Sequence, residues 1–376
     1  MNLKVNKNKL KNLIEIVNRI TGKKGDLEIL NFFRLKAENS TIQINATDLE
    51  ISYQAKLKAE VAKTGEVLIP AKQFFAIISN FFEEEVELEV NNNTVIIKGR
   101  ESFSSLPTLS HEDYPVNQNF NSDNFIEIDS VLFADFLIRV MAPLRTADIF
   151  KPEFDGVYLW LEHDLLKLVT TDTIRLAEVK LKSSFFKTNI KSKKTLIPKK
   201  IIQEYLSVKE KPRETKICFE EDQVVFDLGD QSLIAKVTAV EYPNYQQILP
   251  EIFSLICLVN RDEIDEKLKL NKIFVDQNKE IKLTITPKIK KIELYSKNDL
   301  LGESKNLIET EIKENTLMEN ENFNISINVD FFRDGLESVS TEKVLIGFNF
   351  SDQGSPKPIL IKSPIDDDFL YVLMPL

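Results

Sequence analysis

The sequence predicts an α+β protein built from three tandem domains of similar fold, each with two helices packed on antiparallel sheets. The first observation is a repeated segment, in which a short apolar stretch, a proline, a basic residue two positions on and an apolar helical run follow one another. It occurs around Pro70 and again around Pro198. Proline suits the first turn of a helix, where its missing N–H loses no hydrogen bond. A weaker copy further on has Asn328 at the place of the proline.

Two further residue pairs recur with nearly the same spacing. A Thr-Asp pair ends at Asp48 and again at Asp172, and a Tyr-Pro pair ends at Pro115 and again at Pro243. All these steps have roughly the length of a typical domain. A repeat of this length, kept in the same order, indicates tandem domains and not a solenoid of short repeats. We expect domain 1 at 1–125, domain 2 at 126–252 and domain 3 at 253–376.

Apolar residues spaced for one helix face predict two helices in each domain. In the first helix, Leu10, Leu13 and Val17 follow the i, i+3, i+7 spacing of a buried face. The second helix begins after Pro70 and ends before the acidic run at 83–85. We expect the six helices at 7–20, after Pro70, at 130–142, after Pro198, at 262–275 and at 329–339.

Short runs in which apolar and polar residues alternate predict antiparallel strands. Phe33, Leu35 and Ala37 are an example, and clusters of Asn, Asp and Ser separate such runs. We expect strands at 86–90, 94–98 and 102–106 in domain 1, at 156–162, 165–170 and 174–182 in domain 2, and from 281 onward and at 344–350, 358–362 and 369–374 in domain 3.

The composition indicates a globular protein of the cytoplasm. Of its 376 residues, 43% are hydrophobic and 29% charged, which is far from the composition of a disordered chain. The N-terminus lacks the apolar segment of a signal peptide, and no apolar run is long enough to span a bilayer. Cys218 and Cys257 are the only cysteines, which favours a reducing compartment. His111 and His163 are the only histidines, and neither has a cysteine at ligand spacing, so we expect no metal and no cofactor.

The net charge of −10 argues against a nucleic-acid binder if the whole surface is considered. Net charge does not constrain one face of a molecule, however, and bases can be segregated on it. If the six helices share one side of the assembly, their bases lie on one surface. Each could be an ordinary exposed base, but the basic residue two positions after both prolines favours the shared surface. The candidates are Arg19, Lys72, Arg139, Lys199, Lys200 and Arg333.

An enzyme is not indicated by any motif. The chain has 10 glycines and neither of the glycine-rich loops that cradle phosphates. Two histidines leave little room for a Ser-His-Asp arrangement. The acidic triplet at 366–368 is a poor metal cage, because consecutive residues of a strand point to opposite faces, and we expect a turn there. The two alternatives that stay open are a metal-dependent nuclease and a β-rich scaffold without a role on DNA.

Four segments carry a family resemblance that covers essentially the whole chain. They are Ile44 to Glu50 (INATDLE), Val169 to Ala177 (VTTDTIRLA), Glu241 to Tyr245 (EYPNY) with Ile248 to Pro250, and Tyr371 to Leu376 (YVLMPL). With them the chain resembles the bacterial sliding clamps, the β subunit of DNA polymerase III. The resemblance implies the DNA-clamp fold and a non-catalytic processivity factor. It also implies a ring-shaped head-to-tail homodimer that encircles double-stranded DNA, with helices lining the hole and phosphate contacts that do not read sequence.

The same resemblance implies the partners and the sites. The partners are the catalytic subunit of the replicative polymerase, the clamp loader, and repair and translesion polymerases, all bound through short peptide motifs. The peptide pocket falls on Phe154, Thr171, Thr173, Ile174, Arg175, Leu176, Pro243, Gln247, Ile248, Val372, Leu373, Met374, Pro375 and Leu376. The dimer interface falls on Phe103 and Leu106 on one side and on Ile273 and Phe274 on the other. Lys24 matches a basic position that contacts DNA.

The sequence departs from the family pattern at three places. Thr173 and Ile174 replace a Gly-His pair that is frequent there, and Gln247 stands where an arginine is familiar. Both changes concern the specificity of the pocket. The loop before Phe154 offers Asp148 where polar or aromatic residues contact DNA in the family, so we do not extend the DNA contact to this loop.

Overall fold

The computed structural model describes residues 1–22, 27–115, 120, 123–145, 151–237, 241–250, 252–316, 322–350 and 357–376. These residues form six α-helices and twenty-seven strands, the α+β content that the sequence predicts. The chain divides into two compact units. Unit 1 comprises Met1–Phe133, Phe185–Lys191 and Ile197–Thr238, and unit 2 comprises Ala134–Ser184, Ser192–Leu196 and Ala239–Leu376. We describe each unit by itself.

Unit 1 contains a five-stranded and a nine-stranded sheet, whose strands alternate buried and exposed side chains as the sequence predicts. The first has the order β5 (Glu60–Lys63), β1 (Asn2–Asn6), β7 (Glu85–Asn91), β8 (Thr94–Lys98), β9 (Phe103–Pro107). The second has the order β14 (Phe186–Thr188), β10 (Phe125–Asp129), β16 (Glu214–Phe219), β17 (Gln223–Asp227), β18 (Gln231–Lys236), β4 (Ile51–Lys58), β3 (Thr41–Thr47), β2 (Phe32–Glu38), β6 (Gly65–Pro70). The antiparallel pairing of β18 with β4 joins strands from the first and second predicted domains.

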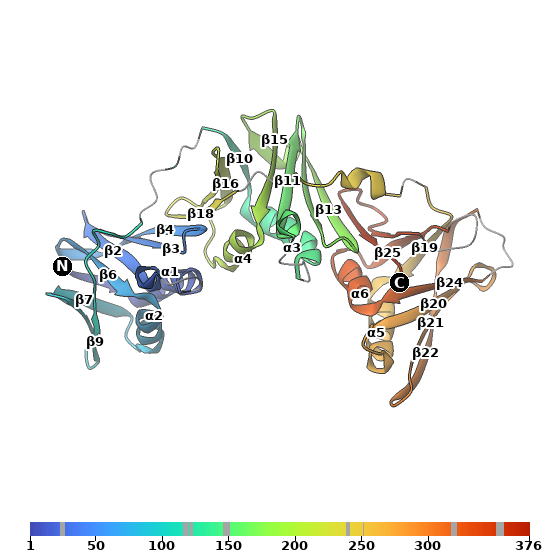
Figure 1. Ribbon diagram of the computed structural model, residues 1–376, viewed down its shortest axis with the longest axis horizontal. Helices are drawn as coiled ribbons and strands as arrows, with labels where there is room; N and C mark the ends of the chain where they lie inside the picture. Colours follow the sequence, from blue (N-terminus) through green and yellow to red (C-terminus); the bar gives the residue numbers. More distant parts are fainter. Residues whose placement is uncertain are drawn as a thin grey trace. The chain divides into compact units, whose positions relative to one another are not determined.

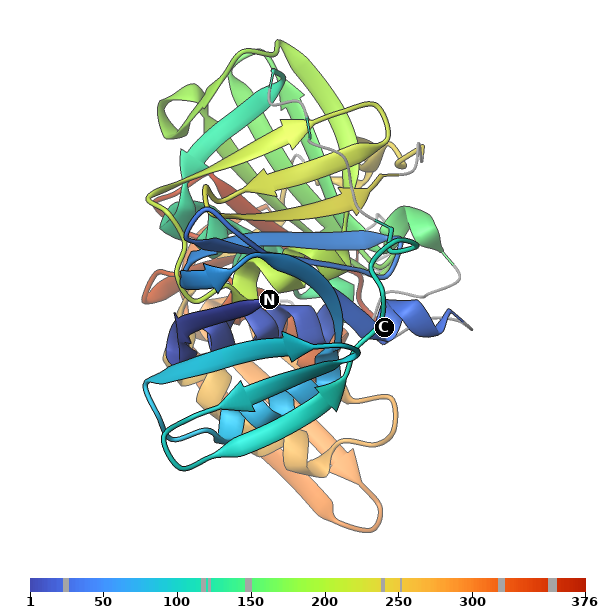
Figure 2. The ribbon, with the colours of Figure 1, turned by 90° about the vertical axis from the view of Figure 1, so that its left-hand side faces the viewer.

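Three helices of unit 1 begin and end close to the predicted positions. They are α1 (Lys7–Ile20), α2 (Ala71–Asn80) and α4 (Lys199–Ser207). Pro70 and Pro198 are the residues that precede the first turn, one position earlier than expected, because their ψ angles of 116° and 139° are those of extended chain. Helices α1 and α2 lie side by side, and the cyan strands β7 to β9 run in front of α2 in Figure 2. The Phe33 and Phe74 rings, 5.3 Å apart, fill the core between β2 and α2.

Unit 2 also contains two antiparallel sheets. The nine-stranded one has the order β15 (Ser192–Pro198), β11 (Gly156–Glu162), β12 (Leu165–Thr171), β13 (Arg175–Lys182), β27 (Phe369–Leu373), β26 (Ile359–Lys362), β25 (Lys343–Phe348), β19 (Leu255–Asn260), β23 (Glu311–Asn315). The four-stranded one has the order β22 (Gly302–Glu309), β21 (Lys291–Asn298), β20 (Glu280–Thr286), β24 (Phe323–Asn328). Here β13 pairs with β27 and joins strands from the second and third predicted domains.

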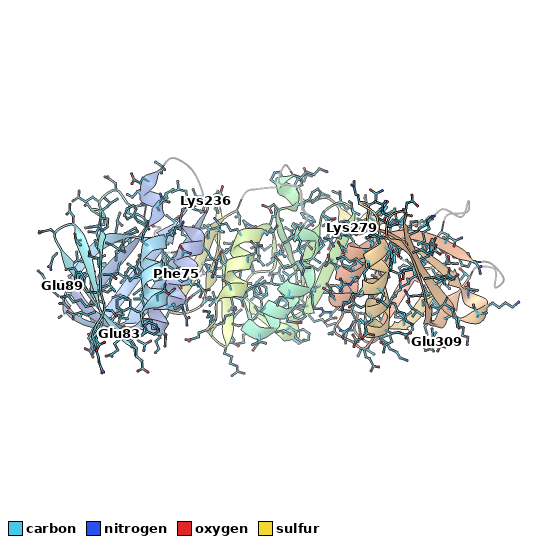
Figure 3. The ribbon with its side chains drawn as sticks, turned by 90° about the horizontal axis from the view of Figure 1, so that it is seen from below. Phe75, Glu83, Glu89, Lys236, Lys279 and Glu309 are labelled. Atoms are coloured by element: carbon cyan, nitrogen blue, oxygen red, sulfur yellow. The ribbon has the colours of Figure 1, made fainter. Side chains whose placement is uncertain are left out.

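The helices of unit 2 are α5 (Arg261–Asn271) and α6 (Val329–Glu337), which lie side by side in Figure 1, while α3 (Ser130–Val140) spans the point at which the two units divide. Asn328, the residue that replaces the repeated proline, caps α6 by accepting hydrogen bonds from Asp330 and Phe331. Lys279, labelled in Figure 3, places its Nζ 2.7 Å from Asp330 in the first turn of α6. None of the helices in the described part of the chain has the length and hydropathy that crossing a bilayer requires.

Candidate peptide groove and basic helix residues

The floor of the candidate peptide groove lies on the outer face of the nine-stranded sheet of unit 2. Leu176 on β13 and Val372 on β27 are register partners across the strand pair. Both are almost fully buried and belong to one apolar cluster with Val169 and Tyr245. Leu373 points to the opposite face, as strand alternation requires, so it supports the core and does not line the groove.

Four of the predicted groove residues are apolar and exposed. The backbone N–H of Met374 donates to the carbonyl of Ile174 at 2.8 Å, and the N–H of Leu376 donates to the carbonyl of Ser326 at 2.9 Å, so the tail continues past β27 in a fixed path. The apolar rim residues with their exposed fractions are Met374 43%, Ile174 44%, Ile248 54% and Leu376 58%. Pro243, Gln247 and Thr173 are also exposed, and Pro375 is half-buried. Most of the predicted groove residues are thus either buried or exposed at the surface.

The turn before β13 is fixed by its own polar side chains. The Oγ1 of Thr171 accepts the N–H of Thr173 at 3.1 Å and donates to the carbonyl of Arg175 at 2.8 Å. The Oδ1 of Asp172 accepts the N–H groups of Ile174 and Arg175 at 3.1 and 3.0 Å. Thr173 has φ +77°, which a β-branched residue rarely adopts and which explains why glycine is familiar at this position.

Arg175 does not line the groove, contrary to the expectation from the resemblance. Its side chain is buried beneath the turn, where Nε donates to Asp172 at 3.0 Å, Nη1 to Asp334, and Nη2 to the carbonyl of Ala142 at 2.9 Å. The guanidinium also lies 4.0 Å from the centre of the Phe331 ring. Burial disfavours the charged form, but Tyr371, Asp334 and Asp172 outweigh burial and raise the pKa of Arg175. Arg175 therefore holds the turn in place from below.

An aromatic cluster that the sequence analysis missed holds the linker before domain 3 against the sheet. The Tyr242 ring stacks on Tyr158 at 4.1 Å, and Phe154, a predicted groove residue, meets Tyr242 edge-on at 6.4 Å. Tyr245 donates its hydroxyl to the buried carboxylate of Glu178 on β13. Burial and the nearby Glu178 charge raise the pKa of Tyr245, so its hydroxyl stays protonated. The Tyr-Pro repeat was the only sequence signal for this cluster.

Arg139 corrects the prediction of the basic surface. Only 8% of the residue is exposed. The guanidinium lies 4.7 Å from the centre of the Phe369 ring, Nε donates to the carbonyl of Ser338 at 3.3 Å, and Nη1 lies 3.5 Å from Asp368. The side chain packs against the end of β27 because an arginine stem and planar head fit an aromatic face. Arg139 is thus a core residue and not an exposed phosphate contact.

The other predicted bases differ in exposure, and three of them bind carboxylates of the same chain. Lys72 is exposed and Lys199 is half-buried. Arg19 donates to Glu204 at 2.8 Å, Arg333 donates to Asp265 at 2.6 Å, and Lys200 forms an ion pair with Asp48. These last three bases are held by carboxylates of the same chain. Lys24 lies outside the described residues.

The predicted interface residues lie at or beside sheet edges. Phe103 is exposed and Leu106 half-buried on β9, which is the edge strand of the five-stranded sheet. Ile273 is exposed and Phe274 half-buried in a 3₁₀ turn that contacts β22, the edge strand of the four-stranded sheet. Each edge therefore combines apolar side chains with the backbone groups of a terminal strand.

The acidic triplet at 366–368 lies in the turn between β26 and β27, as expected. Ser363 accepts the N–H groups of Ile365 and Asp366 at 3.2 and 3.1 Å and closes this turn. Asp367 lies 3.1 Å from Lys362. In the part of the chain that the structure describes, no group of three or more His, Cys, Asp or Glu residues is arranged to hold a metal ion.

Comparison with known proteins identifies the family. Family models for the N-terminal, central and C-terminal domains of the DNA polymerase III beta subunit match residues 1–118, 128–244 and 246–376. The beta sliding clamp of Chlamydia muridarum is 24% identical to this chain, and the match covers 100% of this chain and 99% of the relative. The beta sliding clamp of Staphylococcus epidermidis is 23% identical, and the match covers 93% of this chain and 92% of the relative. The solved sliding clamp of Bacillus subtilis matches with a TM-score of 0.90 at 21% identity, and the DNA polymerase III beta subunit of Thermotoga maritima with 0.88 at 24%, each covering 100% of this chain and 99% of its own.

The three-domain β-clamp fold, with six helices and antiparallel sheets, defines the class of sliding clamps. The chain belongs to the DNA polymerase III beta subunit family. It is a non-catalytic accessory subunit that confers processivity on DNA polymerase III. DNA and the polymerase are the partners that this family implies.

Proposed function

We propose that two copies of this chain close head to tail into a ring that encircles duplex DNA, and that each copy consists of domains at 1–125, 126–252 and 253–376. The hold on DNA is then topological, so the ring slides while it tethers its partners. Family membership supports a cytoplasmic location. The observation that carries the ring is the pattern of strand pairing at the domain junctions.

The three domains repeat the same two four-strand series. One series is β6-β2-β3-β4, β15-β11-β12-β13 and β24-β20-β21-β22; the other is β1-β7-β8-β9, β10-β16-β17-β18 and β19-β25-β26-β27. Within the chain, the last strand of the first series in one domain pairs with the last strand of the second series in the next domain. This pairing occurs at two junctions, between β4 and β18 and between β13 and β27. Among the strands that the structure describes, β22 and β9 are left over in this scheme. They lie in the last and first domains, so we assign the third junction to a contact between chains.

The chemistry of these two edges supports the pairing. A sheet edge with unpaired N–H and C=O groups accepts another strand readily. Exposed Phe103 on β9 and exposed Leu307 on β22 supply apolar surface beside the backbone groups, with Ile273 adjoining β22. Such an interface joins the backbone ladder to apolar contacts, as strand addition does elsewhere.

Contacts with DNA are assigned to phosphates. Lys72 and Lys199 each lie in the first turn of a repeated helix, Lys72 two positions after Pro70 and Lys199 one position after Pro198. Lys24 is assigned to the same surface on the resemblance alone. Lysine ammonium groups position a duplex without reading its sequence. The net charge of −10 limits tight binding and favours sliding.

The groove around Leu176 and Val372 is proposed to receive short apolar peptide segments of the polymerase catalytic subunit, the clamp loader, and repair and translesion polymerases. A buried floor with a rim of Ile174, Ile248 and Met374 suits an aliphatic or aromatic anchor. Methionine at the rim adapts to different partners.

The test combines molar mass with retention on DNA. The protein should run as a dimer, and after loading it should stay on closed circular DNA but leave linear DNA through the ends. Equal loss from both DNA forms would contradict a topological hold. Divalent-metal-dependent cleavage of the DNA would favour the nuclease alternative instead.

A further inference from the structure

A second apolar hollow lies on the outer face of the nine-stranded sheet of unit 2. Its cavity has a volume of about 370 Å³. The apolar lining comprises Ile252, Phe253, Ile256, Leu345, Gly347 and Leu360, and the rim carries Glu314 and Lys362. Ile252 is 80% exposed, so apolar surface is open to solvent here. A contiguous exposed apolar surface of this kind commonly marks an interaction site.

Gly347 sets the position of one wall of the hollow, the Phe253 ring. A Cβ atom at this position would lie 2.5 Å from Cδ1 of Phe253, closer than any real contact. The Phe253 ring therefore lies directly on the backbone of β25, which only a glycine permits. A bulkier residue at this position would displace the ring from the strand.

Strand register connects this hollow to the candidate groove. Leu176 pairs with Val372, Val372 with Leu360, Leu360 with Gly347, and Gly347 with Ile256. These residues form one apolar row across five neighbouring strands on the outer face. Adjacent strands lie about 4.8 Å apart, so the three steps from Val372 to Ile256 span about 14 Å. An extended peptide covers that span in about four residues.

We propose that this hollow is a second subsite for the peptide bound in the groove, and that it takes an aliphatic or aromatic side chain about four residues from the groove anchor. The proposal rests on the proposed groove and names a further requirement on its ligand. Leu360 belongs to both places, since it packs against the groove cluster and lines the hollow. A second copy of the chain is not the occupant, because β9 and β22, the edges assigned to ring closure, do not line the hollow.

Fluorescence anisotropy with three labelled peptides tests the subsite. One is a short Gln-Leu-x-Leu-Phe peptide, and the other two add a five-residue extension with leucine four residues before or after the anchor. One extended peptide should bind the native dimer about tenfold more tightly than the short one, as burial of one further leucine allows. Ile252→Ser and Ile256→Ala should each remove most of this gain and leave the affinity for the short peptide unchanged.

Ile365→Ser is the matched control, because Ile365 is 78% exposed but lies in the turn at the other end of β27. It should keep the full gain, and molar mass and thermal unfolding should match the parent for all variants. The subsite is rejected if both extended peptides bind no more tightly than the short one, or if the Ile252 and Ile256 variants keep the gain. Failure of the short peptide to bind the native dimer would reject the groove itself, and the subsite with it.

Discussion

The Nζ of Lys200 donates to the carboxylate of Asp48, which is remote in the sequence and almost fully buried. Asp48 fixes the turn between β3 and β4 just as Asp172 fixes the turn before β13, since its Oδ1 accepts the N–H groups of Glu50 and Ile51 at 3.1 and 2.8 Å. In both turns the second carboxylate oxygen meets a base. In unit 2 the base is Arg175, at the end of the turn itself, and in unit 1 it is Lys200, which lies on α4. Lys200 on α4 thus helps to hold the turn between β3 and β4.

Replacing Lys200 by methionine should therefore destabilise the protein. The substitution keeps the length of the side chain but leaves a buried carboxylate without its cation, at a cost of about 1–3 kcal/mol. Urea unfolding at pH 7 measures the loss. Lys72→Met is the control, because an exposed lysine should change stability by no more than about 0.5 kcal/mol. Equal midpoints for both variants would show that the pair contributes nothing.

Lys72→Glu combined with Lys199→Glu should weaken DNA binding with the fold intact. Each lost phosphate contact lowers the slope of log K against log salt by about 0.9, so the double variant should lose about two. Salt titrations with a duplex measure the slope, and thermal unfolding checks the fold. Arg139→Met is the contrasting variant, because loss of a buried side chain should lower the unfolding midpoint and leave the slope unchanged. If the double variant loads and binds like the parent, these helices do not contact DNA.

Ile273→Ala with Phe274→Ala should convert the dimer into monomers at low micromolar concentration. Their truncation removes apolar surface beside β22, the edge assigned to the junction between chains. Light scattering gives the molar mass. Phe103→Ala on β9 should act in the same direction, since the two edges are halves of one junction. Dimers that survive all three substitutions would place the interface elsewhere.

Deleting residues 374–376 should abolish binding of a Gln-Leu-x-Leu-Phe peptide. The deletion removes the Met374 rim and both backbone hydrogen bonds that fix the tail, to Ile174 and Ser326. Peptide titration by anisotropy, with molar mass measured in parallel, is the assay. The truncated protein should remain dimeric, because the deleted residues lie outside the two strands assigned to the junction. Unchanged affinity in a dimeric truncation would undo the groove assignment.

The contribution of Asp265 to stability should depend on pH. Burial would raise the pKa of this carboxyl, but hydrogen bonds from Arg333 and Lys269 outweigh burial and leave its pKa below the ordinary value. Folding thus favours the ionised form. The stabilisation is complete above the unfolded-state pKa of about 3.9 and is lost as the pH falls through the lower folded-state value.

Asp265→Asn should accordingly cost roughly 1 kcal/mol at pH 7 and less at pH 3, below the unfolded-state pKa of about 3.9. Urea unfolding at both pH values gives the comparison. Asp299→Asn serves as control, because Asp299 is exposed and should show little effect at either pH. A cost for Asp265→Asn that does not change with pH would mean that the aspartate acts through packing and not through its charge.

Local sequence patterns predicted the helices well because their signals are local. The apolar spacing around Leu13 gave α1, and Asn328 was found from its place in the repeat and proved to be the cap of α6. The helix expected at 262–275 ends earlier, at Asn271, whose side chain turns inward to donate to Ser296 at 3.1 Å. That contact joins two distant segments and leaves no trace in the helical pattern.

The roles of the bases were harder to predict because they depend on contacts between segments that are distant in the sequence. Arg139 lies early in the second predicted domain and Asp368 near the end of the third, yet the β13–β27 sheet brings their elements together. The pair of Lys200 with Asp48 is equally remote. Sequence spacing indicates which side chains share a helix face but not which carboxylate from another element lies in front of it. The residues of the candidate groove were predicted only through the family resemblance.

In each nine-stranded sheet, the strand that is synthesised last occupies the fifth position, in the middle of the sheet. This strand is β18 in one sheet and β27 in the other. During synthesis, β4 is complete at Lys58 but its partner begins only at Gln231, and β13 is complete at Lys182 but its partner begins only at Phe369. At translation rates of about 5–20 residues per second, these strands present an unpaired edge for roughly 10 to 40 s. The nascent chain is therefore most exposed to wrong strand pairing in the middle of its sheets, and the speed of the ribosome between these strands bears directly on the yield of folded protein.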